Sequence, residues 1–208
     1  MVMRLLSIDV GIVNLAACLM EDNLIREWEV DGIPTMCTDD SLFLQMKKHV
    51  DSKPWMITCD TVLIERQPNK NHKIKSIEHF LHTYFLMHNK NVIIYDARHK
   101  VPDIAGPGKG RYRQRKNASI ERCREFLQTT ENAHLVKFFD GHKKKDDLAD
   151  TVMQALSYTP PEPVEPKKKT PRKPTSNQSE TQILKGQLGP GFTRTSPSGS
   201  RRLGFRKI

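Results

Sequence analysis

Several features that would define other classes of protein are scarce in this sequence of 208 residues. Its four cysteines, Cys18, Cys37, Cys59 and Cys123, are scattered and form no Cys-x-x-Cys pair. Their spacing argues against a disulfide framework or a zinc site and favours a reducing compartment. No apolar run approaches the ~20 residues that span a bilayer, and the opening MVMRLLSIDVG reaches an aspartate too early for a secretory signal. We therefore expect a soluble, intracellular protein without a membrane partner.

Hydrophobic residues are also few, at 37% of the chain with a mean hydropathy of −0.60, so part of the chain is not expected to pack. Residues 159–208 contain 11 Lys and Arg against 3 Asp and Glu, a net charge of +8, whereas residues 1–158 carry +2. The boundary, TPPEPVEPKKKTPRKP, is dense in proline and has no apolar period. We predict a globular domain over 1–158 and a disordered basic tail over 159–208.

Two explanations of the tail stay open from its composition. It either solubilises the protein or addresses it to the nucleus, or it attracts a polyanion through phosphate contacts and counterion release. Because blocks of like charge often act as interaction tails, nucleic acid is the favoured partner.

Residues 1–158 alternate between strand and helix patterns. Strands are expected at 3–9, 15–20, 24–30, 62–65 and 91–95, of which the first three form an antiparallel meander. Apolar residues at helical spacing predict helices at 40–50, 75–89, 118–128 and 146–157. The Gly/Pro-rich segment before the third helix is predicted to be a loop. This order of elements indicates an α/β domain.

Acidic side chains occur where core residues are expected. Asp9 ends one apolar strand, Glu65 ends another, and Asp146, Asp147 and Asp150 open the last helix. Singly, each has an ordinary explanation as a turn residue, a partner for a neighbouring arginine or a first-turn helix acid. Together they are more specific, because converging carboxylates repel unless a cation lies between them. Mg²⁺ is the natural ion for an all-oxygen site, with Mn²⁺ as a substitute.

A basic run lies between the fifth strand and the third helix. Its cations are Lys109, Arg111, Arg113, Arg115, Lys116, Arg122 and Arg124, against the single acid Glu121. With Tyr112 interleaved, the run is expected to follow a phosphate backbone, the alternative being a solvated charged loop. Lysines at 70, 73 and 75 and at 143–145 are expected to flank the same site.

Four short motifs contain these acidic and basic residues. In chain order they are SIDVG, IERQP, RYRQRKNASIE and KKKDDLADT, and together they resemble motifs of the poxvirus-type Holliday junction resolvases. That family belongs to the RuvC-like branch of the ribonuclease H superfamily, and the resemblance spans about residues 3–156. It implies a ribonuclease H-like fold, a five-stranded mixed sheet flanked by helices. Asp9, Glu65, Asp147 and Asp150 match the catalytic metal ligands of the family, and Lys116 matches its functional lysine. Asp146 is expected to lie next to these ligands and to support them without binding the metal itself.

The resemblance also implies an activity and its partners. We expect a Mg²⁺-dependent crossover junction endodeoxyribonuclease, a homodimer that nicks four-way DNA junctions symmetrically and acts on branched or concatemeric DNA. Arg111, Arg113, Arg115 and Lys116 are expected to contact that DNA. A viral source and a location at the host-cell site of viral DNA replication, cytoplasm or nucleus, would follow. Two alternatives remain: a ribonuclease H-like enzyme that cuts RNA in hybrids, and a nucleic-acid-binding module without catalysis.

Overall fold

The computed structural model describes residues 3–33, 41–104 and 106–160. The predicted tail, apart from residues 159 and 160, and Cys37 lie outside these residues. In the described part of the chain, none of the helices is both long enough and apolar enough to cross a lipid bilayer. Cys18, Cys59 and Cys123 are buried free thiols.

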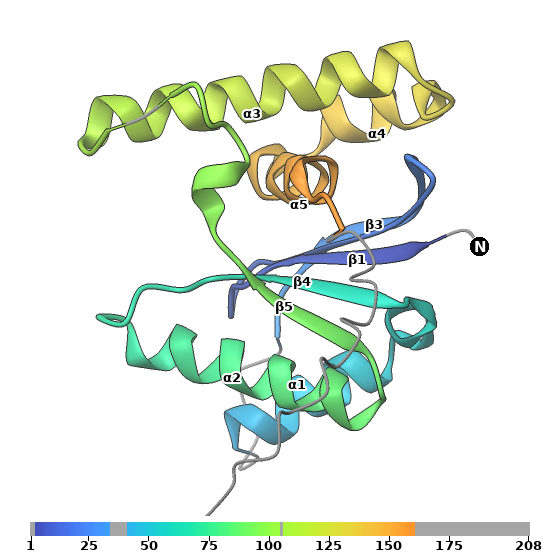
Figure 1. Ribbon diagram of the computed structural model, residues 1–208, viewed down its shortest axis with the longest axis vertical. Coiled ribbons are helices and arrows are strands. Elements are labelled where there is room, and N and C mark those ends of the chain that lie inside the picture. The colour runs from blue at the N-terminus through green and yellow to red at the C-terminus, as the bar shows by residue number, and fades with distance from the viewer. Residues whose placement is uncertain (1–2, 34–40, 105, 161–208) are drawn as a thin grey trace, which may run out of the picture. The chain divides into compact units, whose positions relative to one another are not determined.

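One five-stranded mixed sheet forms the centre of the domain, in the order β3-β2-β1-β4-β5 (Figure 1). The predicted meander is confirmed: β1 (Arg4–Asp9), β2 (Leu15–Glu21) and β3 (Leu24–Asp31) are antiparallel neighbours. On the other side of β1 lie β4 (Thr61–Glu65) and β5 (Asn91–Tyr95), both parallel to it. The carboxyl ends of β1, β4 and β5 therefore meet at one edge of the sheet.

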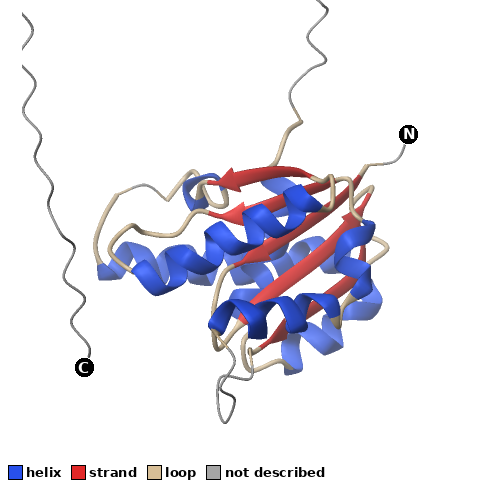
Figure 2. Cartoon of the chain, turned by 90° about the horizontal axis from the view of Figure 1, so that it is seen from below, coloured by secondary structure: helices blue, strands red, loops and turns tan. Residues whose placement is uncertain are grey.

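Helices cover both faces of the sheet, with α1 and α2 on one face and α3, α4 and α5 on the other (Figures 1 and 2). Their bounds are α1 (Leu42–Asp51), α2 (His72–Met87), α3 (Lys109–Thr129), α4 (Val136–Gly141) and α5 (Lys145–Ser157). Short 3₁₀ turns lie at η1 (Pro54–Thr58), η2 (Ala97–His99) and η3 (Ala133–Leu135). Of the five α-helices in the described residues, the sequence predicted four and missed α4, which is too short for a periodic pattern.

Helix α3 corrects one prediction. The basic run was expected to lie in a loop before a helix starting at 118, but α3 already begins at Lys109. The run RYRQRK consists mostly of good helix formers, and it follows Gly108, whose φ of +110° suits the turn into the helix. Alternating arginines therefore point in different directions around a helix and do not line one side of a strand-like loop.

The sheet is covered on both faces by apolar side chains. Leu6 and Ile8 of β1 pack toward α1 and α2, in a cluster with the fully buried Phe85. Leu5 of the same strand joins the opposite cluster, which contains Leu148 of α5. A strand buried on both faces that ends in an acid needs a partner for that charge, because an isolated buried charge is costly.

Candidate active site

The two acidic strand ends lie side by side because β1 and β4 are parallel neighbours. Ile8 pairs with Ile64 in the register of the sheet, so the next residues, Asp9 and Glu65, emerge at the same edge. Gly11 allows the chain to turn sharply after Asp9, since a Cβ atom at that position would come within 1.9 Å of the Asn14 carbonyl oxygen.

Asp9 and Glu65 form a hydrogen-bonded carboxyl pair. Burial raises the pKa of Asp9 well above its usual range, and the hydrogen bond and charge of Glu65 raise it further. The pKa of Glu65 moves down: burial opposes this, but the hydrogen bond with Asp9 and the charge of Lys100 outweigh it. Asp9 and Glu65 therefore bring two like charges to one buried point, where positive charge is needed to compensate them.

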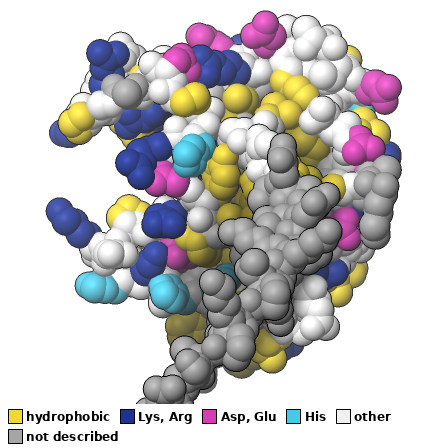
Figure 3. Space-filling view, in the orientation of Figure 1, with side chains coloured by type: hydrophobic (Ala, Val, Ile, Leu, Met, Phe, Trp, Pro, Cys, Tyr) yellow, Lys and Arg dark blue, Asp and Glu magenta, His cyan; other side chains and the backbone are white. Residues whose placement is uncertain are grey.

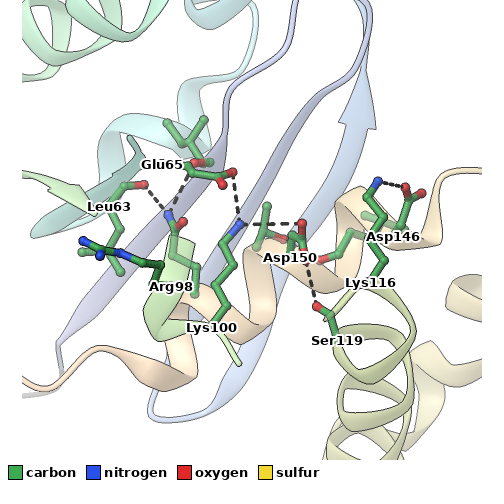
Figure 4. A network of polar contacts seen from close by, with 12 residues as sticks. Leu63, Glu65, Arg98, Lys100, Lys116, Ser119, Asp146 and Asp150 are labelled. Carbon is green, nitrogen blue, oxygen red and sulfur yellow. Dashed lines mark hydrogen bonds and ion pairs between the residues drawn. The ribbon is translucent and has the colours of Figure 1, made fainter. Parts of the chain in front are cut away.

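Lys100 is the cation of this cluster, and the sequence analysis missed it. It follows β5 and the turn η2, and its side chain is only 5% exposed. Its Nζ lies 3.1 Å from Glu65 Oε2 and 3.8 Å from Asp150 Oδ2 (Figure 4). Burial lowers the pKa of Lys100, but the charges of Glu65, Asp150 and Asp9 raise it by more. The sequence contained one signal for Lys100: it lies shortly after β5, and parallel strands end at the same edge of the sheet as the acids.

Helix α5 brings Asp150 to the same cluster. Ser119 of α3 donates a hydrogen bond of 2.8 Å to Asp150 Oδ1 (Figure 4). Burial raises the pKa of Asp150, although Lys100 and Ser119 partly oppose the rise. Asp147 lies one turn earlier, where it pairs with Lys144 at 3.9 Å. Burial and the charge of neighbouring Asp146 raise the pKa of Asp147.

Lys116 lies beside this cluster and pairs with Asp146 (Figure 4). Burial lowers the pKa of Lys116, but the hydrogen bond and charge of Asp146 raise it by more. Its Nζ also lies 5.4 Å from the centre of the Tyr112 ring, a cation–π contact. The role of Asp146 follows from this ion pair, because its carboxylate holds Lys116 at the margin of the cluster.

A cavity of about 650 Å³ opens next to the acids. Its walls include Glu65, Lys100, Asp150, Tyr112, Arg115 and Lys116. Figure 3 shows Lys and Arg side chains gathering on the side where α2 and α3 begin, around a hollow in the surface. The carboxylates thus lie beside an opening bordered by positive charge.

The predicted DNA-contacting residues occupy different environments. Arg111 and Arg113 are exposed near the start of α3. Arg115 is half-buried and donates a hydrogen bond of 3.0 Å to the Gly106 carbonyl, so it also fixes the loop before the helix. Among the lysines expected to flank the site, Lys75 pairs instead with the buried Glu78, at 2.7 Å.

Gln154 of α5 ties the two acidic strands to the helix that carries Asp150. Its Nε2 donates to the Ile8 carbonyl at 3.4 Å and to the Leu63 carbonyl at 3.1 Å. These carbonyls lie one residue before Asp9 and two residues before Glu65. The side chain is fully buried, so these bonds form away from water, where a missing partner is expensive.

The donors of the cluster suit a hard divalent ion. As the side chains stand, no three His, Cys, Asp or Glu residues of the described ranges are arranged to hold one ion. The acids that do converge, Asp9, Glu65 and Asp150, present oxygen donors only and are gathered around one buried cation. Oxygen donors and a need for positive charge fit Mg²⁺ or Mn²⁺.

The mixed five-stranded sheet with helices on both faces is the ribonuclease H-like fold that was predicted. Three solved structures share the fold. The Fowlpox virus resolvase in complex with Holliday junction DNA is 22% identical with a TM-score of 0.56, and the match covers 75% of this chain and 96% of that one. The yeast mitochondrial Holliday junction resolvase is 18% identical with a TM-score of 0.55, covering 74% of this chain and 78% of that one. RuvC of T. thermophilus in complex with a Holliday junction substrate is 14% identical with a TM-score of 0.50, covering 75% of this chain and 94% of that one.

The chain belongs to the poxvirus A22 protein family, whose pattern matches residues 3–161. The resemblance to the poxvirus-type resolvases is thereby confirmed. A relative from Invertebrate iridescent virus 3, uncharacterized protein 97L, is 34% identical over 102 residues. The match covers 48% of each protein, so it spans about half the length of that relative.

Proposed function

We propose that this protein is a divalent-metal-dependent endonuclease that resolves four-way DNA junctions by paired, symmetric nicks. The observation that carries the proposal is the convergence of Asp9, Glu65 and Asp150 from three elements at one edge of the sheet, beside a cavity with basic margins. Membership of the family and the junction complexes of its structural neighbours support the choice of substrate.

The chemistry follows from what phosphodiester hydrolysis requires. Mg²⁺ ions held by Asp9, Glu65, Asp147 and Asp150 would supply an activated water and stabilise the leaving 3′ oxygen. Asp9 lies at the end of the central strand β1, next to Glu65 of β4, and would be one of the residues that hold the metal. Lys116 lies at the margin of the cluster, where its ammonium stabilises negative charge on the scissile phosphate.

The DNA contacts are proposed to be mainly electrostatic. Arg111 and Arg113 project from α3 into solvent, and the tail adds a net charge of +8. A junction resolvase must act on many sequences, so contacts to the phosphate backbone and recognition of shape suit it better than base contacts. We also propose that the protein acts at the site of viral DNA replication in the host cell, either the cytoplasm or the nucleus.

A homodimer is proposed because a four-way junction has two-fold symmetry and two equivalent sites cut it symmetrically. An aromatic surface on the α1/α2 side supports this assembly. Phe43 is 46% exposed and stacks on Phe80 of α2, with ring centres 5.9 Å apart, and Tyr84 continues the row. Phe43 is exposed, whereas Phe80 and Tyr84 are half-buried. Aromatic side chains are enriched at protein contact sites, which fits Phe43 as the point of contact.

Cleavage of a labelled mobile four-way junction, with and without Mg²⁺, tests the proposal. We expect paired nicks in opposed strands only when the ion is present. Asp140→Asn, in an exposed ion pair with Arg124, serves as a control that should cut normally. Preferred cleavage of an RNA–DNA hybrid would favour the first alternative, and junction binding that ignores Mg²⁺ without any nicking would favour a module without catalysis.

A further inference from the structure

Lys100 has an unusual environment for a lysine. Its side chain is 5% exposed, whereas lysines are almost never buried unless they are paired. Its Nζ lies between carboxylates from two elements, 3.1 Å from Glu65 and 3.8 Å from Asp150, and its charge also acts on Asp9. The ammonium therefore occupies the position where the positive charge of the cluster is needed.

The ammonium is held by charge more than by directional bonds. Within residues 3–33, 41–104 and 106–160, no group forms a hydrogen bond of good geometry with its Nζ, in spite of the short distance to Glu65. Lys100 also lines the cavity beside the acids. A flexible side chain with few directional bonds and open space next to it can leave the carboxylates once another cation compensates their charge.

We propose that Lys100 is a built-in counter-cation that holds Asp9, Glu65 and Asp150 together in the metal-free protein and competes with divalent ions for them. One ammonium supplies a single positive charge, whereas a divalent ion supplies two at shorter range. The two cations repel each other at this spacing, so metal binding displaces the ammonium into the cavity. The inference rests on the proposed function only in taking these acids as the metal site.

The competition predicts opposite effects of Lys100→Met on two quantities. Without metal, the variant leaves the carboxylates uncompensated, so its melting temperature in EDTA falls by several degrees. With metal, the competing cation is gone, so the Mn²⁺ concentration that gives half of the full thermal shift falls about tenfold. At saturating Mn²⁺, most of the difference in melting temperature between variant and wild type disappears.

Lys75→Met is the matched control, because Lys75 also pairs with a buried carboxylate, Glu78, outside the cluster. Its loss of stability should be the same with and without Mn²⁺, and its half-saturating concentration should match that of the wild type. If Lys100→Met behaves like this control, Lys100 is merely structural and the proposal is wrong. If Mn²⁺ shifts the melting temperature of neither wild type nor variant, the metal part of the proposed function fails as well.

Amine labelling of the full-length wild-type protein gives a second readout that needs neither cleavage nor DNA. Acetic anhydride should modify Lys100 slowly in EDTA, because the ammonium is buried, and several-fold faster when Mn²⁺ displaces it. Mass spectrometry of the digested protein measures this, with Lys75 as the internal reference whose labelling should not respond to Mn²⁺. Labelling of Lys100 that stays slow at saturating Mn²⁺ overturns the displacement.

Discussion

At the scale of single residues, the conflict between burial and charge explains the properties of Asp9. Burial raises its pKa, and the negative charge of Glu65 raises it further. The same two conditions favour a divalent cation at this point, since it removes the repulsion between the two carboxylates. Charge at Asp9, and not its shape, is therefore the property on which the proposed metal site would depend.

Asp9→Asn tests this directly. The amide keeps the volume of the side chain but removes the charge that a metal ligand needs, so cleavage should fall to background. Junction binding should persist, because the exposed arginines of α3 are unchanged. Parallel gel-shift and cleavage assays on one preparation measure junction binding and cleavage. Retained cleavage in this variant would show that Asp9 is not a metal ligand.

Lys116 and Asp146 form an ion pair with unequal expected roles. Lys116→Met should reduce cleavage by about 10²-fold, the usual cost of losing one donor to a developing oxyanion. Asp146→Asn frees the lysine without removing it, so its effect should be less than about tenfold. Single-turnover cleavage rates compare the two variants, and equal losses would show that the pair acts only as a structural unit.

At the scale of elements, the parallel strands decide where the acids lie. β1, β4 and β5 end at the same edge and deliver Asp9, Glu65 and, through η2, Lys100. Helix α5 adds Asp150 and also clamps both acidic strands through Gln154. The helix therefore both carries one acid of the cluster and fixes the strands that carry the other two.

Gln154→Leu should weaken the clamp. Two buried carbonyls lose their donor, so the free energy of unfolding should fall by about 1–3 kcal/mol. Cleavage should also fall at limiting Mg²⁺ and recover partly at high Mg²⁺, since the acids are misplaced and not removed. Gln128→Leu, at an exposed position of α3, is the control. A loss of stability without any change in the Mg²⁺ dependence would contradict the positioning role.

Helix α3 should contribute to DNA binding through its exposed arginines. The double variant Arg111→Gln/Arg113→Gln should weaken junction binding and reduce the slope of log affinity against log salt by about 2, one unit for each lost phosphate contact. Arg26→Gln is the control, because that guanidinium is already paired with Glu21. If the slope of log affinity against log salt does not change in the double variant, these arginines of α3 do not contact the DNA.

At the scale of the whole molecule, the two helical layers have different surfaces. The α3 side borders the acidic cluster and its cavity, whereas the α1/α2 side presents the aromatic row of Phe43, Phe80 and Tyr84. This division would separate the proposed DNA surface from the proposed dimer surface, so that dimerisation would leave the acids accessible.

Phe43→Glu should convert the dimer to a monomer, because it places a charge in the aromatic row. Phe138→Glu is the control: Phe138 is similarly exposed, at 43% against 46%, but lies on α4 on the opposite face of the sheet. Sedimentation velocity at several concentrations distinguishes the two states. A wild-type protein that sediments as a monomer at all concentrations would rule out the homodimer.

The sequence by itself determined the elements of the sheet and the acids at their ends. Apolar runs closed by turn residues are local signals, and an acid that ends such a run is visible without knowledge of the fold. The turn at Asp22 and Asn23, both with positive φ, is likewise set by residues that tolerate that backbone conformation. The start of α3 was missed because two glycines and a proline precede a run whose charge obscured its helix propensity.

Only the tertiary structure decided which charges meet. Lys100 and Asp150 are 50 residues apart and touch because β5 and α5 converge at one edge of the sheet, a long-range relation that no local pattern contains. The partners of Lys116 and Arg115 and the clamp of Gln154 depend on packing in the same way. Local sequence fixes the chemistry that each segment carries, whereas burial and strand order fix the distances over which charges act.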